Sequence, residues 1–478
     1  MEQHETMNAC LQREDFEKNG QLSGFAPDDP VIFQEPTVVI DSREITGGEI
    51  FVALKGEQTD GHHFVRQAFE KGAACAIVSR EWFSRQGSSA HEAGARYLVT
   101  ADTTEAMQRL AALYRLKFAI PVIGIGGSNG KTTTKEMTAS VLRARYSVHM
   151  SEGNFNNHLG VPLTLFGLRE KHEVAVVEMG INHPGEMELL AEIAAPTHGM
   201  LTNIGHEHLE FLRDLDGVAN AETALYRYVQ KSGGVVFVNR EDRRLTEAAA
   251  GIPSTVGYGI ALEGEGFWAE DIRMDNLGRA LFTLCSSAGN APVTLGFAGR
   301  HNVSNAVAAA TVGFHFGLTQ EEIAGGLERL KPEEGWKRLE FQRAGGITIV
   351  NDTYNANPDS VRNALDLLCE LPVTGKRVAV IGDMLELGGV SSPEHEEIGR
   401  YAASLDGLDA FYTFGEQAAL CCRTAGMKCA GHFMDHGELQ HLLHESLSPG
   451  DVLLLKGSRG MKLERVAEGL MNLSGPDQ

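Results

Sequence analysis

The chain contains no long apolar run. None of its hydrophobic stretches approaches the ~20 residues that a membrane-spanning helix needs. Its opening stretch, MEQHETMNACLQREDFEKNG, is polar and acidic, which is not the pattern of a signal peptide. We therefore expect a protein that has no membrane span and works in the cytoplasm.

The sequence also lacks a regular cysteine pattern. Its seven cysteines are odd in number and scattered, and no two of them have CxxC spacing. This distribution argues against a zinc ribbon and against a disulfide framework. It suits a reducing compartment.

Positive charge is in short supply. The 42 lysines and arginines stand against 64 aspartates and glutamates, which gives a formal net charge of −22 at pH 7. A protein that binds a phosphate backbone needs a basic surface. We therefore expect no nucleic-acid partner.

The length and the pattern of elements predict several α/β domains. At 478 residues the chain exceeds what one hydrophobic core usually serves. Strand and helix patterns alternate over most of it, which favours mainly parallel sheets. A helix that starts at Glu105 ends near Lys117, Pro121 then opens a new strand, and the polar stretch LKPEEGWKR follows much later. We predict three domains, at residues 1–117, 118–335 and 336–478.

The stretch GIGGSNGKTTTKE, Gly124 to Glu136, has the pattern of a phosphate-binding loop that runs from a strand into a helix. Backbone N–H groups of such a loop surround phosphate oxygens, while Lys131 would neutralise the terminal phosphates and Thr132 would bind Mg²⁺. One position departs from the general pattern GxxxxGK[ST], because Ile125 stands where glycine is expected. The alternative is a plain glycine turn.

Two further stretches carry polar residues at the ends of apolar strands. Glu178 ends the strand VAVVE, where a carboxylate can hold Mg²⁺ or orient a water beside phosphates. The segment TNIGHEHLE places His206 and His208 after another strand. A zinc pair is possible in principle, but a third and a fourth ligand are missing; one histidine can instead assist a carboxylate-rich magnesium site. The alternative is a solvated glutamate and histidines in a polar loop.

These stretches occur with others in a fixed order: GxxGSNGKTTTKE, GNFNNHLGVPLTLF, VVEMGINHPGEM, TNIGHEHLE, GRHNVSNAVAA, NDTYNANPDS, GDMLELG and LLLKGSRG. Together they resemble the Mur ligase family. The earlier stretch VIDSREITGGEIFVALKGEQTDGHHFVRQA is similar to the family's N-terminal, UDP-sugar-binding domain. YNANP, GDMLELG and KGSRG resemble the member that adds D-alanyl-D-alanine, and the resemblance covers about residues 37 to 470.

The resemblance implies a three-domain α/β fold with a central parallel-sheet, P-loop ATPase-like domain and a Rossmann-like C-terminal domain. It implies an ATP- and Mg²⁺-dependent ligase, active as a monomer, that joins D-alanyl-D-alanine to UDP-N-acetylmuramoyl-tripeptide through an acyl phosphate in peptidoglycan synthesis. The first domain would bind the UDP-sugar, the second ATP and the third the incoming dipeptide. Two alternatives stay open: another Mur-type amide ligase, or a regulatory nucleotide-binding homologue with altered catalysis.

The resemblance also assigns residues to the nucleotide and to the metal. Seven residues of the loop fit the ATP phosphates: Gly127, Ser128, Asn129, Gly130, Lys131, Thr132 and Thr133. Three more fit the adenosine: Asn239, Asn302 and Asp352. The metal is assigned to Thr132, Glu178 and His208, and Arg338 is the arginine that the third domain brings to the phosphates.

The remaining assignments concern the substrates that are joined. Ser42 and Arg43 fit the UDP-sugar site, and Asn156 and Asn157 fit the muramoyl-peptide face. Three residues fit the dipeptide: Asn355, Asn357 and Arg459, whose cation suits a carboxylate. For each asparagine the alternative is a capping or turn role.

One position departs from the family. The family carries a lysine after the histidine motif that reacts with CO₂ to form a carbamate, which binds the second Mg²⁺; the matching stretch GVANAETALYRY holds Glu222 instead. A carbamate is electrostatically a carboxylate on a long arm, so Glu222 is interpreted as a built-in catalytic and metal-binding substitute. The alternative is a helix-surface residue in an enzyme with altered or lost activity.

Overall fold

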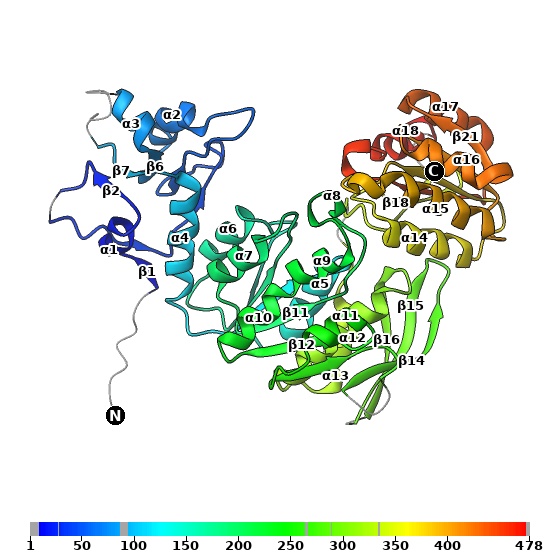
Figure 1. Ribbon diagram of the computed structural model, residues 1–478, viewed down its shortest axis with the longest axis horizontal. Helices are drawn as coiled ribbons and strands as arrows, with labels where there is room; N and C mark the ends of the chain where they lie inside the picture. Colours follow the sequence, from blue (N-terminus) through cyan, green and yellow to red (C-terminus); the bar gives the residue numbers. More distant parts are fainter. Residues whose placement is uncertain are drawn as a thin grey trace.

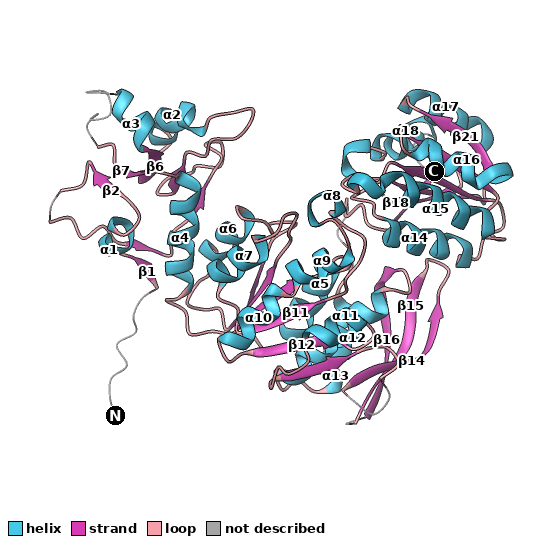
Figure 2. Ribbon diagram, viewed as in Figure 1, coloured by secondary structure: helices cyan, strands magenta, loops and turns pink. Residues whose placement is uncertain are grey.

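The computed structural model describes residues 9–26, 28–86, 94–262, 266–287, 289–332 and 335–474. Three α/β units follow one another along these residues, and the first and third units stand at opposite ends of the middle one (Figure 1). Helices cover strands in each unit (Figure 2). The predicted fold class, α/β with a central parallel sheet, is confirmed.

The first unit contains a five-stranded sheet in the order β2-β7-β6-β5-β4, in which only β2 runs antiparallel to its neighbour. Its strands are β2 (Gln21–Ser23), β4 (Val38–Val39), β5 (Ile50–Val52), β6 (Cys75–Ser79) and β7 (Tyr97–Thr100). Its helices are α1 (Arg13–Glu17), α2 (Val65–Glu70), α3 (Arg80–Gln86) and α4 (Thr103–Arg115). A short ribbon pairs β1 (Cys10–Leu11) with β3 (Phe33–Gln34).

The middle unit is built on a six-stranded, fully parallel sheet in the order β13-β12-β11-β8-β10-β9. The strands are β8 (Val122–Gly126), β9 (Val148–Met150), β10 (Val174–Glu178), β11 (His198–Leu201), β12 (Val235–Asn239) and β13 (Thr255–Tyr258). The chain moves to one side of β8 for β9 and β10 and to the other side for β11 to β13. Ligands of open parallel sheets bind at such a reversal, beyond the carboxyl ends of the strands.

Nine helices and a second sheet complete the described part of the middle unit. The helices are α5 (Lys131–Leu142), α6 (Gly160–Phe166), α7 (Glu186–Ala194), α8 (Leu209–Leu212), α9 (Leu215–Glu222), α10 (Ala224–Lys231), α11 (Arg243–Ala248), α12 (Asn302–His315) and α13 (Gln320–Arg329). The second sheet is antiparallel, with strands β14 (Phe267–Met274), β15 (Arg279–Ser286) and β16 (Gly289–Ala298). At the β14–β15 turn, Gly278 lies so close to α14 of the third unit that a Cβ would be 2.6 Å from Leu367.

The third unit has six strands in the order β17-β18-β22-β19-β20-β21, of which only β17 is antiparallel. The strands are β17 (Glu340–Ala344), β18 (Ile347–Asp352), β19 (Arg377–Gly382), β20 (Ala410–Phe414), β21 (Cys429–Phe433) and β22 (Val452–Lys456). The helices are α14 (Pro358–Glu370), α15 (Ser391–Ser404), α16 (Ala418–Ala425), α17 (His436–Ser446) and α18 (Glu464–Ser474). The domain boundaries at 117/118 and 335/336 stay a prediction.

The central strands are apolar because helices or loops cover both faces of their sheets. Every residue of β8, β10 and β22 is buried. Strands of parallel sheets read as nearly continuous apolar runs for this reason. Each fully buried large aliphatic side chain contributes ~1.5–3 kcal/mol, so β8 is a rigid base for the loop that follows it.

Two of the cysteines form a disulfide that the sequence analysis did not predict. Cys422 of α16 and Cys429 at the start of β21 form a disulfide, with their Cα atoms 5.1 Å apart. The helix and the strand are joined by a tight turn that returns the chain, so a seven-residue separation becomes a short distance in space. No described helix is long and apolar enough to cross a membrane.

Two imidazoles are kept neutral by burial. Desolvation, together with the charge of nearby His315, lowers the pKa of His198, the first residue of β11, to about 4. Desolvation also lowers the pKa of His301, just before α12, to about 4. Between pH 6.5, which is near their ordinary pKa, and pH 4, these two imidazoles are therefore protonated in the unfolded chain but neutral in the folded chain.

We expect the free energy of unfolding to fall as the pH drops from 6.5 towards 4. Each imidazole steepens the loss by up to ~1.4 kcal/mol per pH unit. Urea midpoints measured at several pH values check this, and His198→Gln should flatten the profile. His441→Gln, a change at a largely exposed imidazole, is the matched control. A profile equally steep in His198→Gln would contradict the assignment.

Candidate active site

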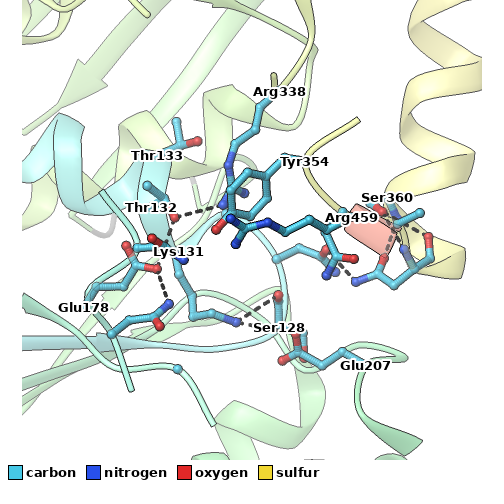
Figure 3. Close-up of a pocket in the computed structure, with 18 of the residues that line it drawn as sticks. Ser128, Lys131, Thr132, Thr133, Glu178, Glu207, Arg338, Tyr354, Ser360 and Arg459 are labelled. Carbon is cyan, nitrogen blue, oxygen red and sulfur yellow. Dashed lines mark hydrogen bonds and ion pairs between the residues drawn. The ribbon is translucent and has the colours of Figure 1, made fainter. Parts of the chain in front are cut away.

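A cavity of about 580 Å³ lies between the middle and third units. On one side it is lined by the loop after β8, by Glu178 and by the segment after β11. On the other side it is lined by residues that follow β18 and β22. The carboxyl edges of two parallel sheets therefore face the same space, and Figure 3 shows side chains from both units pointing into it.

The loop after β8 needs glycine at two positions. Gly127 and Gly130 have φ values of 106° and 84°, which L side chains rarely adopt. A Cβ on Gly127 would also lie 2.4 Å from the Thr202 hydroxyl, and one on Gly130 would lie 2.5 Å from Asn305 Oδ1. Ile125, the departure from the general pattern, is buried inside β8 rather than in the loop, so its side chain does not disturb the turn.

Lys131 lies at the base of the loop with 14% of its side chain exposed. Its Nζ donates to the carbonyls of Gly127 and Ser128 and lies 3.4 Å from Glu207 Oε2. Burial alone lowers the pKa of the ammonium group, but the carboxylates of Glu207, Glu222 and Glu178 outweigh it and raise that pKa. Lys131 is therefore a firmly protonated cation at the point where the loop would meet phosphate.

The Glu178 carboxylate fits a cation. Its Oε1 accepts hydrogen bonds from Thr132 Oγ1 at 3.1 Å and from Asn156 Nδ2 at 2.8 Å. Its Oε2 is buried without a hydrogen-bond partner, and Lys135 Nζ lies 3.8 Å away. A hydroxyl beside an unsatisfied carboxylate oxygen is the hard oxygen donor set that Mg²⁺ prefers.

The two histidines after β11 do not form a pair. His206 Nδ1 lies 3.3 Å from Asp359 of the third unit, whereas His208 Nδ1 lies 2.6 Å from Glu386 of that unit. His208 lines the cavity. Across the described ranges, no three histidine, cysteine, aspartate or glutamate side chains converge as a metal site would require. A cation here would take further ligands from phosphate and water, as Mg²⁺ commonly does.

Glu222 lies beneath the loop and does not line the cavity. It is fully buried at the end of α9, and its Oε2 accepts the Gly127 N–H at 2.8 Å. Its Oε1 has no hydrogen-bond partner. Desolvation raises the pKa of this carboxyl to about 7, although Lys131 opposes the shift. The alternative of a helix-surface residue does not describe this buried position.

The third unit places cations and aromatic rings in the same cavity. Arg338 Nη2 donates to Thr132 Oγ1 at 3.2 Å, and its guanidinium lies 3.9 Å from the centroid of the Tyr354 ring (Figure 3). At the ends of neighbouring strands, Lys456 Nζ donates to Asp352 Oδ2 at 2.6 Å. Arg459 also lines the cavity.

Most residues predicted for ligands line this cavity: Ser128, Asn129, Gly130, Lys131, Thr132, Thr133, Asn156, Asn157, Glu178, His208, Asn302, Arg338, Asp352, Asn355, Asn357 and Arg459. Five predicted residues lie elsewhere: Ser42, Arg43, Gly127, Glu222 and Asn239. Their roles, like those of the lining residues, stay predictions.

Several of the asparagines have structural hydrogen bonds. Asn157 Oδ1 accepts the N–H groups of Leu159 and Gly160, and Asn357 caps α14 while also donating to Asn129. Asn302 Nδ2 donates to the Ala298 carbonyl at 2.6 Å. These hydrogen bonds match the capping and turn alternative. They do not involve every polar atom that lines the cavity.

The predicted UDP-sugar residues belong to the first unit, away from this cavity. Ser42 is buried and donates to Gln67, whereas Arg43 is exposed and pairs with Asp41. Asn239 ends β12, and its amide is held by the carbonyl of Thr202 and the N–H of Glu241.

Sequence reasoning missed five residues that the structure brings to the cavity or its edge: Glu207, Tyr354, Asp359, Glu386 and Lys456. All five lie inside the quoted motifs, but their individual tasks depend on contacts between distant segments. The one local signal is the position of Lys456 at the end of the apolar strand VLLL.

Sequence models of three Mur ligase domains match the chain in order. The Mur ligase family catalytic domain matches residues 37–115, the Mur ligase middle domain residues 125–313, and the Mur ligase glutamate ligase domain residues 337–459. A curated relative from Bacillus subtilis (strain 168) is 36% identical over 439 residues, which are 91% of this chain and 93% of the relative. The chain belongs to the Mur ligase family.

Named relatives and solved structures extend the comparison. The B. subtilis relative and one from Escherichia coli (strain K12), 34% identical over 91% of this chain and 93% of its own length, are both named UDP-N-acetylmuramoyl-tripeptide–D-alanyl-D-alanine ligase. A crystal structure of MurF from Acinetobacter baumannii matches with a TM-score of 0.84 and 32% identity, covering 97% of this chain and 99% of that one. MurF ligase from Thermotoga maritima in complex with ADP matches at 0.79 and 28%, covering 92% and 97%. The predicted three-domain Mur ligase architecture is confirmed.

We expect Gly127→Ala to weaken nucleotide binding to this Mur ligase by at least ~10-fold, which is ~1.4 kcal/mol. The added methyl group would meet Thr202 and strain a left-handed backbone. Titration with a fluorescent ATP analogue checks this. Gly233→Ala, at a left-handed glycine with open space around it, is the matched control. Equal affinity in both variants would contradict the expected crowding at the loop.

Proposed function

We propose that this Mur ligase joins D-alanyl-D-alanine to UDP-N-acetylmuramoyl-tripeptide at the expense of ATP, within peptidoglycan synthesis. A substrate carboxylate takes the γ-phosphate of ATP to become an acyl phosphate; the dipeptide amine then displaces phosphate. The observation that carries the proposal is the meeting of Lys131 from the middle unit with Arg338 and Arg459 from the third in one cavity. The names of the relatives that match along most of the chain support the choice of substrates.

The cations have a common task. Both steps gather negative charge on phosphoryl oxygens or on the tetrahedral carbon's oxygen, and fixed positive charge stabilises it most when water is excluded. Lys131 and the N–H groups of its loop would hold the phosphates, and Arg338 would reach them from the third unit. Bound Mg²⁺ would be held by Thr132, Glu178 and His208, and it would polarise the phosphoryl oxygens.

The other ligands would occupy the remaining walls. Asn302 and Asp352 would hold adenosine, with Asn239 near the base and with Phe297 and Trp336 as apolar lining. Asn355, Asn357 and Arg459 would hold the dipeptide, whose carboxylate suits the guanidinium. Asn156 and Asn157 would face the muramoyl peptide, and Ser42 and Arg43 its UDP-sugar. The enzyme would act as a monomer, and the use of ATP supports a cytoplasmic site of action.

The deciding assay is ADP release with UDP-N-acetylmuramoyl-tripeptide, with and without D-alanyl-D-alanine. We expect sustained release only when both substrates are present. Lys131→Ala should lower turnover at least ~10²-fold with the fold intact, because the developing charge loses a fixed counter-charge. Lys231→Ala, an exposed lysine at the end of α10, is the control. ADP release that does not depend on the dipeptide would favour the regulatory alternative. Near-normal turnover of Lys131→Ala would contradict the assignment of this loop to the ATP phosphates.

We further propose that Glu222 replaces the family's carbamate. Three features support this: full burial, one oxygen without a hydrogen-bond partner and electrostatic coupling to Lys131. Its arm is shorter than a carbamylated lysine, so it would reach a second Mg²⁺ through a bridging water or a shift of α9. Its other oxygen would keep the Gly127 N–H in place.

Glu222→Gln separates the charge from the hydrogen bond, since glutamine still accepts the Gly127 N–H. We expect at least ~10-fold slower turnover, about 1.4 kcal/mol in barrier, and a weaker dependence on Mg²⁺. Wild-type activity should not respond to bicarbonate, because no carbamate has to form. Glu247→Gln, on the exposed face of α11, is the control. Full activity of Glu222→Gln, or stimulation of the wild type by bicarbonate, would show that this carboxylate is not the substitute.

A further inference from the structure

Both histidines of the GHEH segment, residues 205–208, contact a carboxylate of the third unit. Asp359 Oδ2, in the first turn of α14, accepts the His206 N–H at 3.0 Å and lies 3.3 Å from His206 Nδ1. Glu386 Oε2 lies 2.6 Å from His208 Nδ1. The third unit therefore contacts this segment of the middle unit at both histidines.

The Glu386 contact is reinforced by the backbone. Its carbonyl accepts the Glu210 N–H at 3.1 Å, so the segment before η3 (Gly388–Val390) lies directly against α8. A Cβ on Gly388 would be 2.7 Å from the Glu210 Cα, which means that only glycine permits this approach. Glu386 and His208 themselves have left-handed φ values of 67° and 51°. Strained backbone of this kind persists where surrounding contacts hold it, often at functional sites.

The two nitrogens of His208 face different partners. Nδ1 faces Glu386, whereas Nε2 lies 3.7 Å from Glu207 Oε2, and both His208 and Glu207 line the cavity. The distance between Glu386 Oε2 and His208 Nδ1 is that of a hydrogen bond, but the angle at the contact is not. Hydrogen bonds at catalytic centres commonly straighten only when ligands bind.

We propose that Glu386 is a positioning residue, whose carboxylate fixes the proton of His208 on Nδ1 and turns the free electron pair of Nε2 towards the cavity. Carboxylates that hold the second nitrogen of a metal-binding imidazole act in this way, and they also make the imidazole more basic. Because Glu386 belongs to the third unit, the affinity of the middle unit for a cation then depends on third-unit docking. The inference rests on the proposed function only in taking the cavity as a magnesium–nucleotide site.

Asp359 provides an internal comparison. It also joins the third unit to the GHEH segment, but its partner His206 does not line the cavity. Removal of its charge should loosen docking without freeing the His208 ring. Glu386 would both dock the third unit and orient the His208 ring. A comparison of variants at the two carboxylates therefore separates docking from orientation.

The experiment compares Glu386→Gln with Asp359→Asn in the full chain. Glutamine retains the size but can either accept from Nδ1 or donate to it, so it no longer selects one tautomer. Mn²⁺ binding, followed by electron paramagnetic resonance with a non-hydrolysable ATP analogue, is the first readout. We expect a dissociation constant raised at least ~10-fold in Glu386→Gln and less than ~3-fold in Asp359→Asn. Glu397→Gln, an exposed pair with Arg400 on α15, should match the wild type.

The second readout needs no metal. Ring ¹⁵N shifts of His208, assigned with a His208→Gln variant, should report an Nδ1-protonated ring in the wild type and a mixture in Glu386→Gln. Glu386→Asp, which keeps the charge on a shorter arm, should recover part of the Mn²⁺ affinity. Wild-type Mn²⁺ affinity in Glu386→Gln would overturn the proposal, as would an equal loss in Asp359→Asn or an unchanged tautomer. A wild type that binds Mn²⁺ but lacks ligase activity would refute the proposed function alone.

Discussion

The cavity depends on one electrostatic arrangement: a lysine held among carboxylates under a glycine loop. Lys131 stays protonated because Glu207, Glu222 and Glu178 surround it, and those groups stay close together because Lys131 lies between them. Removal of the Lys131 charge would leave these carboxylates close together without their cation, which is unfavourable in a low-dielectric interior. The unsatisfied oxygens of Glu178 and Glu222 belong to this cluster, where desolvation raises the pKa of Glu222 against the opposing charge of Lys131.

The third unit meets that cluster with charge of both signs. Arg338 contacts Thr132, where an arriving phosphate would need a cation, and Glu386 contacts His208 in the segment after β11. A ligand that binds at this boundary therefore contacts groups whose positions depend on both units. Differential contacts of this kind are what allow a ligand to shift the balance between open and closed arrangements.

Much of this could be predicted from the sequence, for reasons that are local. The strand, turn and helix around Lys131 are encoded in one continuous stretch. Glu178 ends the apolar strand β10, which pairs in parallel with β8 and therefore ends at the same edge of the sheet as the loop. Glu386 has no local signal, because its partner His208 is far away along the chain and the contact exists only after two units dock. Asn157 and Asn357 show the opposite limit: one residue type serves both caps and ligands, so its pattern cannot separate the two. The Cys422–Cys429 bond was missed because a turn rather than a spacing rule creates it.

The β14–β15 turn gives the third unit a second support. Gly278 of that turn lies against Leu367 in α14, apart from the contact between Glu386 and α8. These two supports add to the hydrogen bonds that Arg338, Asn357 and Asp359 make with the middle unit. A Cβ on Gly278 would lie 2.6 Å from Leu367 and one on Gly388 would lie 2.7 Å from the Glu210 Cα, so both close approaches between the units require glycine. Any movement of the third unit away from the cavity therefore has to break contacts at several separate places along the boundary.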